Sequence, residues 1–324
     1  MPALEFPLGP GGEFDLIRAI ADRLGARGAR LGDDCALVSA GEDSLVLSTD
    51  MSIEGVHFHR EWLSAEEIGW RAAMGALSDL GAAGAACVGL LAAISGPRTD
   101  PPERMVELME GVGGAVDAVG GVVLGGDLAA APLWTLAITA VGRTRRPMSR
   151  RGARPGDGIW VTGSLGGARA AVAAWESGRV PADPLRSAFA RPRARIAEGQ
   201  WLANEGAHAM MDLSDGLAGD AHHLANASGV ALELALDHLP VAEGVAAEAE
   251  RLGRPAAELA AEGGEDYELL VALPPGFGAG EAERFRASCG LPLTRVGSAR
   301  EGRGVTMRLG GRAVALTGFD HFRR

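Results

Sequence analysis

We predict five separate turns in this chain that each end in a carboxylate flanked by small residues. They are Gly32-Asp33-Asp34, Ser48-Thr49-Asp50, Leu77-Ser78-Asp79, Gly125-Gly126-Asp127 and Asp212-Leu213-Ser214-Asp215-Gly216. Carboxylate and hydroxyl oxygens are the hard ligands that Mg²⁺ prefers, and Mg²⁺ often shares one or two carboxylates with a substrate phosphate. A single Asp of this kind is more often a turn or a helix cap. If the five segments converge, however, they require neutralising cations, so the sequence predicts metal-dependent phosphate chemistry.

The chain contains no lysine, and all 31 of its basic residues are arginines. This composition excludes a P-loop lysine, the strand lysine of protein kinases and a Schiff base. A phosphotransferase of this composition must take its positive charge from metal ions and arginines. The Arg-rich stretch 143–155 is the ordinary composition of a solvated linker, but we expect one of its arginines to hold a phosphate.

Composition limits the class of protein further. The chain has 324 residues, 47% of them hydrophobic, which is enough for two domains with a large core. The net charge of −11 argues against nucleic acid or an anionic membrane as a partner. Three widely spaced cysteines predict neither a disulfide framework nor a zinc ribbon. The first residues lack a signal-peptide pattern, and the longest apolar stretch, 82–94, is too short to span a bilayer. We therefore expect a cytoplasmic protein.

Helical and strand patterns alternate along the chain. The first half has predicted helices at 14–24, from Ser64 to near Asp79 and from Pro101, and predicted strands at 36–38, 44–48, 86–94, 121–124 and 133–141. In the second half, strands are predicted at 158–162, 209–211, 230–236, 267–273, 294–296, 305–309 and 313–316. This pattern is α/β (α+β). The Arg-rich stretch breaks the periodicity, so we divide the chain into domains 1–145 and 146–324.

Three further motifs have a functional and a structural interpretation. The glycine turn 163–167 could touch a phosphate, although a tight turn is the better interpretation. His57 and His59 have the spacing of a strand and could suggest zinc, but the surrounding oxygens favour Mg²⁺. We expect His57 to donate a hydrogen bond to substrate and His59 to be structural. In 263–270, strand alternation places Glu265, nearest the glycine turn, at the site.

Taken in order, these motifs resemble the thiamine-monophosphate kinase family over nearly the whole chain. The superfamily traits are the Gly-Asp-Asp and Gly-Gly-Asp segments. The kinase-specific stretches are Ser48-Thr49-Asp50 with Glu54-Gly55-Val56-His57-Phe58, the 212–216 motif, and Gly264-Glu265-Asp266-Tyr267-Glu268-Leu269-Leu270. The superfamily also includes aminoimidazole-ribonucleotide synthetase, selenophosphate synthetase and a hydrogenase maturation protein.

The resemblance implies ATP-dependent phosphorylation of thiamine phosphate to thiamine diphosphate with several Mg²⁺ ions. It also implies a homodimer whose N-terminal domains build a shared β-barrel. By motif position, the implied metal ligands are Asp33, Ser48, Thr49, Asp50, Asp79, Asp127, Asp212 and Asp215. The implied ATP contacts are Gly126, Asp127, Arg151 and Ser214, and the implied substrate contacts are His57, Glu265 and Phe319. Phe319 stands where many relatives carry Trp, and Met109 stands where relatives commonly place an aromatic side chain against adenine.

The acceptor in this reaction is itself a phosphate anion, so attack on the γ-phosphoryl group needs alignment and charge neutralisation but no general base. We therefore expect direct in-line transfer without a phosphoenzyme.

Three alternative functions remain open. One is another enzyme of the same superfamily, such as an aminoimidazole-ribonucleotide synthetase, that uses ATP to activate an amide oxygen. Selenophosphate synthetase expects a reactive Cys in a Gly-rich segment, whereas Cys35 follows the acidic turn. A non-catalytic module that binds Mg-nucleotide or a divalent cation is the third alternative.

Overall fold

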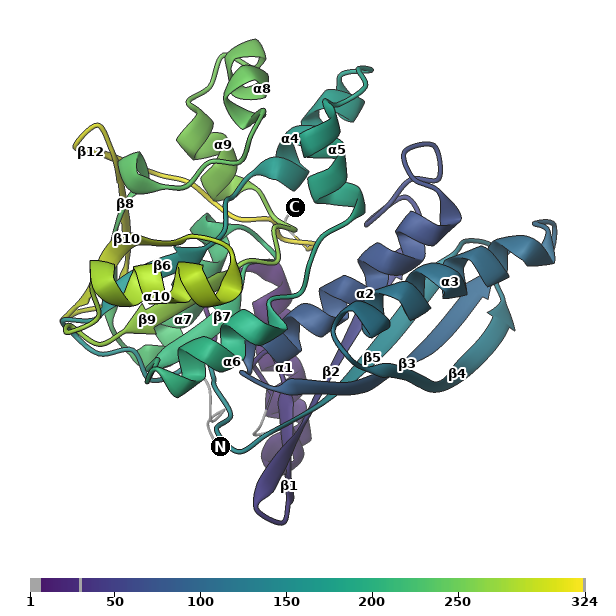
Figure 1. Cartoon of the computed structure of the whole chain (residues 1–324), viewed down its shortest axis with the longest axis horizontal. Helices are drawn as coiled ribbons and strands as arrows, with labels where there is room; N and C mark the ends of the chain where they lie inside the picture. Colours follow the sequence, from purple (N-terminus) through teal and green to yellow (C-terminus); the bar gives the residue numbers. More distant parts are fainter. Residues whose placement is uncertain (1–6, 29–30, 323–324) are drawn as a thin grey trace.

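The computed structural model describes residues 7–28 and 31–322, and within them the chain forms two sheets with helices packed against them (Figure 1). The N-terminal sheet has the strand order β1-β2-β5-β3-β4. Its strands are β1 (Ala36–Ala40), β2 (Asp43–Ile53), β3 (Ala86–Gly96), β4 (Val122–Ala130) and β5 (Thr135–Thr144). Only β3 and β4 are parallel. The helices α2 (Ala65–Ala82) and α3 (Pro102–Ala118) follow β2 and β3, while α1 (Gly12–Leu24) and a short 3₁₀ turn (Gly25–Gly28) precede the sheet.

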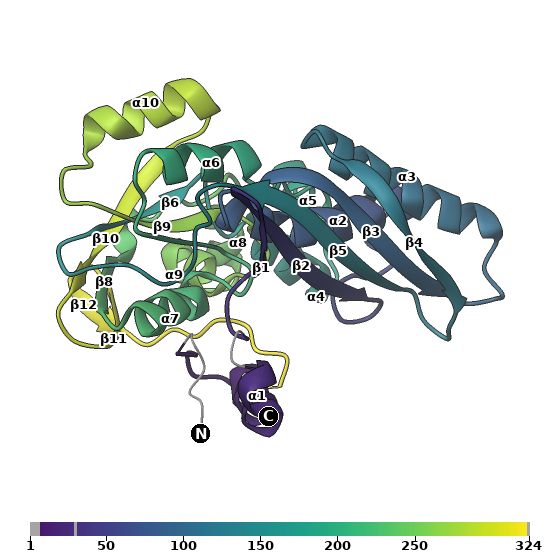
Figure 2. The same ribbon diagram turned by 90° about the horizontal axis from the view of Figure 1, so that it is seen from below.

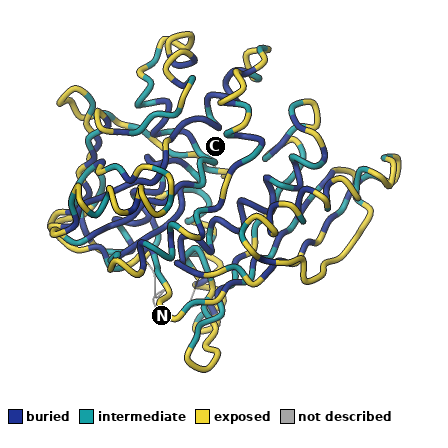
Figure 3. The backbone as a smooth tube through the Cα atoms, viewed as in Figure 1, coloured by how far each residue is buried: buried dark blue, intermediate teal, exposed yellow. Residues whose placement is uncertain are grey.

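One face of the N-terminal sheet is buried and the other is open. Alternate residues of β5, including Leu136 and Ile138, are fully buried in the core that also contains α2 and α3. On the open face Met51 is 55% exposed, and β4 is exposed along its whole length (Figure 3). Within the described residues the sheet does not close on itself, so the single chain does not form the expected barrel.

The C-terminal sheet has seven strands in the order β12-β11-β8-β10-β6-β9-β7. They are β6 (Gly158–Thr162), β7 (Ala209–Asp212), β8 (Ala231–Ala235), β9 (Leu269–Leu273), β10 (Leu293–Arg300), β11 (Gly304–Leu309) and β12 (Arg312–Val314). Helices α6 (Ile196–Asn204) and α10 (Ala279–Cys289) lie over one face, and α7 (Leu217–Ser228) and α9 (Ala256–Glu262) lie over the other (Figure 2). Neighbouring residues of a strand face opposite ways. Trp160 therefore joins the core under α6 and α10, and Val161 joins the core under α7 and α9.

The two halves pack tightly through α2. The core around α2 includes Leu185 and Phe189 of α5 (Asp183–Ala190) and residues of α4 (Gly167–Glu176) and α8 (Val245–Arg251). A Cβ on Gly199 of α6 would lie 1.9 Å from the carbonyl oxygen of Gly81, so the glycine permits the close approach of α6 to α2. Residues 145–157 connect β5 to β6 without a helix or strand, and the division at 145/146 stays a prediction. No helix in the described ranges has the length and apolar character to cross a membrane.

The α/β class and the two mixed sheets are confirmed, but two local predictions were wrong. The Gly125-Gly126-Asp127 segment is not a turn, because β4 continues through it to Ala130. Gly125 has φ +152° beside a shift in the β3–β4 register, and a Cβ on Gly126 would lie 1.9 Å from the carbonyl oxygen of Ala92. The strand predicted from Tyr267 begins at Leu269 instead, because Glu265 and Tyr267 have φ of +67° and +51°, which no strand tolerates.

Two glycines of α3 allow a matched test of the packing of α3 on α2. A Cβ on Gly111 would lie 1.9 Å from the carbonyl oxygen of Glu66, whereas a Cβ on Gly113 meets nothing within 4 Å. We expect Gly111→Ala to lower the free energy of unfolding by about 1–3 kcal/mol through overpacking. Gly113→Ala should raise it by about 0.5–1 kcal/mol because Ala favours the helix. Urea denaturation of both variants measures this, and equal effects would contradict the close approach.

Candidate active site

A cleft of about 750 Å³ lies between α2 and the C-terminal domain. Its volume falls within the range of small-molecule sites. Four aspartates line it: Asp50 on β2, Asp79 near the end of α2, and Asp212 and Asp215 at the end of β7 and the turn after it. The cleft also carries His57, Arg71, Glu265 and Phe319, so it has an acidic region and a region of mixed aromatic and charged residues.

Carboxylates from three distant segments meet beside this cleft. Oxygens of Asp34, Asp79 and Asp212 all lie within 4.8 Å of one another. Asp34 comes from the loop before β1, and Ser48 on β2 donates a hydrogen bond to Asp79. The predicted convergence is therefore found for Asp79 and Asp212, with Asp50 close enough to raise the pKa of both.

Burial raises the pKa of these carboxyl groups, and their mutual repulsion raises it further. The pKa of Asp212 is raised to about 8, first by burial and then by Asp34. The pKa of Asp50 is raised to about 6 by burial and by the same neighbour, and that of Asp79 lies well above its usual value. Such groups hold protons in the absence of a cation and lose them to one that binds. An all-oxygen set of this kind fits a hard divalent cation such as Mg²⁺.

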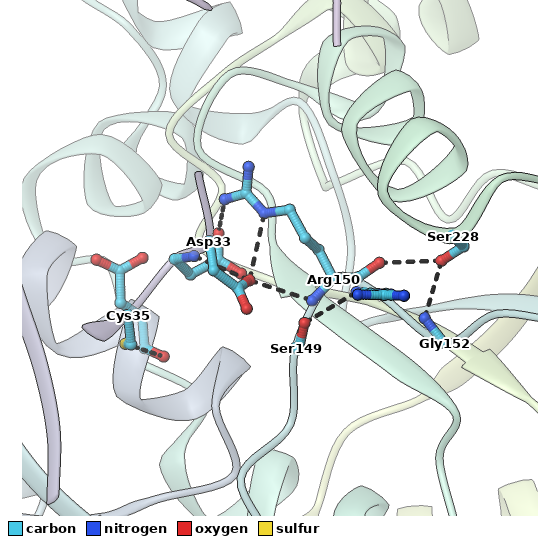
Figure 4. Close-up of polar contacts among 9 residues, drawn as sticks. Asp33, Cys35, Ser149, Arg150, Gly152 and Ser228 are labelled. Carbon is cyan, nitrogen blue, oxygen red and sulfur yellow. Dashed lines mark hydrogen bonds and ion pairs between the residues drawn. The ribbon is translucent and has the colours of Figure 1, made fainter. Parts of the chain in front are cut away.

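Arg150 joins the acidic turn at residues 33–34 to the C-terminal domain (Figure 4). Its buried guanidinium forms an ion pair with Asp34, and its backbone N–H donates to Asp33 over 3.3 Å. The hydroxyl of Ser228 on α7 donates to the carbonyl oxygen of Arg150 at 3.1 Å. The sequence prediction chose Arg151, whose side chain is exposed. The predicted contact of Arg151 with ATP stays a prediction, and the buried role of Arg150, from the same Arg-rich stretch, was not predicted from the sequence.

His57 and Glu265 lie in the cleft, and each has a defined partner. The backbone N–H of Ile53 donates to Nδ1 of His57 over 3.1 Å, so the ring proton of the neutral imidazole is on Nε2. The pKa of His57 is lowered, first by burial and then by His321, whose ring centroid lies 4.9 Å away. Glu265 forms an ion pair with Arg71 of α2. The ring of Phe319 lies against His321, with 4.7 Å between their centroids.

Aromatic side chains form one wall of the cleft. The rings of His59 and Trp62 have centroids 4.2 Å apart, and Trp62 stacks on Trp175 of α4 at 4.9 Å. Phe189 closes the wall, and the guanidinium of Arg71 lies over its ring at 3.7 Å from the centroid. The sequence interpretation left His59 as structural, and it missed Arg71 because a single Arg inside a helix carries no local signal.

The glycine turn 163–167 is filled by acidic side chains. Both carboxylate oxygens of Asp266 accept from the backbone N–H of Gly166 at 2.9 Å. Glu268 accepts from the hydroxyl of Thr162 at 2.6 Å and pairs with Arg195. These acids follow Glu265 in the chain, so the turn fixes the position of the segment that carries Glu265. This arrangement agrees with a structural role for the turn.

Several predicted residues lie away from the carboxylate cluster. The hydroxyl of Thr49 is on the opposite face of β2 from Ser48, where it bonds to the hydroxyl of Thr139 at 2.8 Å. The strand register aligns Asp50 with Gly126 across β5 and β3, so the backbones of β2 and β4 are about 14 Å apart. Gly126 and Asp127 are thus distant from the cluster within one chain. Met109 packs partly buried against the core of α2 and α3.

Ser214 and one unpredicted acid lie at the C-terminal side of the cleft. Ser214 lines the cleft, and its carbonyl oxygen accepts from the N–H of Glu265 at 2.7 Å. Glu13 of α1 also lines the cleft and raises the pKa of both Asp50 and Asp215. The pKa of Asp215 is raised to about 7, first by burial and then by Glu13. In the sequence, only the Gly-Gly pair before Glu13 could have indicated that Glu13 lies at the site.

Comparison with known proteins agrees with this architecture. Residues 32–144 match the sequence model of the AIR synthase related protein N-terminal domain, and residues 154–310 match that of the C-terminal domain. The two halves of the chain are therefore the N-terminal and C-terminal domains of an AIR synthase related protein. Named relatives within this class narrow the assignment further.

The thiamine-monophosphate kinase of Aquifex aeolicus is 34% identical over 315 residues, which cover 96% of this chain and 98% of that one. That of Mycobacterium tuberculosis (strain CDC 1551 / Oshkosh) is 34% identical over 271 residues, or 80% of each chain. The solved structure described as "AaThiL complexed with AMPPCP and TMP" has a TM-score of 0.85 at 33% identity and covers 96% of this chain and 97% of its own. The chain belongs to the thiamine-monophosphate kinase family.

The raised carboxyl pKa values predict how stability depends on pH. The native pKa of Asp212 is about 8, Asp215 about 7 and Asp50 about 6, all above the value of about 3.9 in an unfolded chain. The native state therefore binds more protons than the unfolded state, and these groups make the free energy of unfolding fall as pH rises from about 4 to 8. Melting temperatures of chelator-treated protein should fall across this range.

Two variants test whether the buried carboxyl groups cause this fall in melting temperature. Asp212→Asn cannot ionise, so its melting temperature should fall less between pH 5 and pH 8 than that of the unsubstituted protein. Asp117→Asn, at an exposed position of α3, should behave like the unsubstituted protein. An Asp212→Asn variant with an undiminished fall would show that the buried cluster does not cause it.

Proposed function

We propose that this chain transfers the γ-phosphoryl group of ATP to thiamine phosphate and so forms thiamine diphosphate. The observation that carries the proposal is the cleft itself, which places a cation-demanding carboxylate cluster beside an aromatic wall in a member of the thiamine-monophosphate kinase family. The related structure bound to AMPPCP and TMP supports ATP as the phosphoryl donor. We place the reacting phosphates over the carboxylates and the organic part of the acceptor along the aromatic wall.

The carboxylates would hold Mg²⁺ ions between the protein and the two phosphate groups. Asp34, Asp79 and Asp212 form the close cluster of this set, and Asp50 and Asp215 line the cleft with it. Bound Mg²⁺ would neutralise the two polyanions that must approach each other. Ser48 holds the carboxylate of Asp79 toward the cluster, and Arg150 supplies a fixed positive charge behind Asp34.

His57 has the protonation state of a hydrogen-bond donor rather than a base. Its Nδ1 accepts from the N–H of Ile53, which leaves the Nε2 proton for an acceptor in the cleft. An oxygen of the phosphate acceptor is anionic at neutral pH, so His57 only has to orient it. We propose in-line transfer without a phosphoenzyme and without a general base.

The aromatic wall suits the organic part of thiamine phosphate, which contains a cationic thiazolium ring and an aminopyrimidine ring. Cations bind favourably over the faces of Trp and Phe rings. Glu265 lies beside this wall and is held by Arg71, so an acceptor for the aminopyrimidine amino group is already positioned. We propose that Phe319, half exposed at the rim, closes over the substrate.

We also propose a homodimer formed through the N-terminal sheets. Residues 48–53 of β2 pair with β5 on one side only, and β4 is unpaired along its outer edge, as judged from the described residues. Exposed apolar side chains, among them Met51 and Leu128, cover the open face and this edge. Pairing of β4 from a second copy with β2 would close the barrel, and it would bring Asp127 and Gly126 of that copy toward Asp50.

The dimer proposal is tested by placing a charge on β4. Leu128 is 63% exposed in the single chain, so Leu128→Asp should leave the monomer folded while opposing burial of this strand between copies. Light scattering after size exclusion should give twice the chain mass for the unsubstituted protein and the chain mass for the variant. Val180→Asp, at an exposed loop position, is the matched control and should stay dimeric. A monomeric unsubstituted protein would refute the proposal.

The reaction itself is tested by product analysis after incubation with Mg-ATP and thiamine phosphate. We expect stoichiometric ADP and thiamine diphosphate from the unsubstituted protein and from Asp117→Asn. Asp50→Asn keeps the shape of the side chain but loses the anionic ligand, so its turnover should fall at least about 100-fold. Chelation of divalent cations should abolish turnover. ATP binding without thiamine diphosphate formation would instead support a sibling ATP-dependent enzyme or a binding module.

A further inference from the structure

A second group of potential ligands lies at the start of α7. Asp215 precedes the helix, and Asp220 and His223 are three residues apart on one of its faces. One ring nitrogen of His223 and one oxygen from each carboxylate all lie within 4.8 Å of one another. This group differs from the first cluster because it contains an imidazole.

His223 is buried without a polar partner. The residue is 6% exposed, and its Nδ1 is buried and makes no hydrogen bond. The ring stacks on Phe14 of α1 with 3.9 Å between centroids, and Gly9 packs so closely that a Cβ there would lie 2.4 Å from Nδ1. These contacts hold the ring in place but give Nδ1 no hydrogen-bond partner. A buried polar ring left in this state is costly unless a ligand binds it.

The carboxylate of Asp220 is also short of partners for its degree of burial. The residue is 1% exposed, and one of its oxygens accepts the backbone N–H of Asp215 at 3.2 Å. Burial raises the pKa of this carboxyl well above its usual value, and the nearby charge of Arg150 offsets this only in part. A cation that accepts both nitrogen and oxygen ligands would therefore stabilise both the buried carboxylate of Asp220 and the buried ring of His223.

We propose that Asp215, Asp220 and His223 form a second binding site, which shares Asp215 with the main cleft, for a first-row transition-metal dication such as Mn²⁺, Co²⁺ or Zn²⁺. Imidazole favours these ions, whereas carboxylate oxygens alone suit Mg²⁺. Ligand atoms bonded at about 2.1 Å lie up to about 4.2 Å apart, so the side chains need only a small closure. An adjacent cavity of about 230 Å³, lined by Asp215 and His223, gives access and leaves room for water ligands.

The site would join α1 to the C-terminal domain. Phe14 and Gly9 already hold the ring of His223 from the α1 side, and Asp215 also lines the main cleft. A metal ion here would fix the position of Asp215 without occupying the cluster of Asp34, Asp79 and Asp212. The proposal does not depend on the reaction, because it concerns binding alone.

The test is a Co²⁺ titration of chelator-treated protein in the presence of excess Mg²⁺, which occupies the all-oxygen cluster. We expect one Co²⁺ per chain, with visible absorption bands and a paramagnetically shifted imidazole N–H signal in proton NMR. His223→Gln should lose the shifted signal and bind Co²⁺ at least about tenfold more weakly. His238→Gln, at an exposed position, is the matched control and should behave like the unsubstituted protein.

A second variant guards against misfolding of His223→Gln. Asp220→Asn preserves the shape of the side chain and should weaken Co²⁺ binding by at least about tenfold, while the histidine signal is still observed at saturating Co²⁺. Absence of Mg²⁺-resistant Co²⁺ binding in the unsubstituted protein would overturn the proposal. Retention of the shifted imidazole signal by His223→Gln would overturn it as well, because another histidine would then be the ligand.

Discussion

The repulsion among buried carboxylates is the constraint on which the rest of this structure depends. Asp34, Asp79 and Asp212 come from a loop, a helix and a strand that are far apart in the sequence, yet their oxygens lie within 4.8 Å. Folding must therefore bring these acidic groups together, and burial of the hydrophobic core around α2 supplies favourable free energy that offsets this cost. The site is a strained arrangement that protons relieve in the absence of a cation.

Close helix packing makes this arrangement rigid. Gly69, Gly111 and Gly199 let α3 and α6 approach the backbone of α2, the helix that carries Asp79. On the opposite side of the cleft, the left-handed backbone at Glu265 and Tyr267 is held by hydrogen bonds to the carbonyls of Ser214 and Leu213. The helix that carries Asp79 and the segment that carries Glu265 are thus both held in position by the surrounding structure without a bound ligand.

Local sequence patterns predicted what local physics determines. The capping box at Ser64 and the periodic strands predicted elements that the structure contains, and the small-residue segments around Asp79 and Asp212 predicted carboxylates that the structure brings together. The patterns failed where distant segments decide the outcome. No spacing rule could show that Arg150 rather than Arg151 turns inward, that Arg71 reaches Glu265, or that β4 continues through three residues that look like a turn. Each of these depends on partners more than 30 positions away.

The orientation of α2 has an electrostatic consequence of its own. The helix ends at Ala82, so Asp79 lies in its last turn, where the helix dipole is equivalent to roughly half a negative charge. This end of a helix repels an anion and attracts a cation. The backbone of α2 therefore adds to the field of the carboxylates and has no basic residue in its last turn to offset it. Any ion that binds there is selected by charge density as well as by ligand type, which favours small dications over the more abundant monovalent ions.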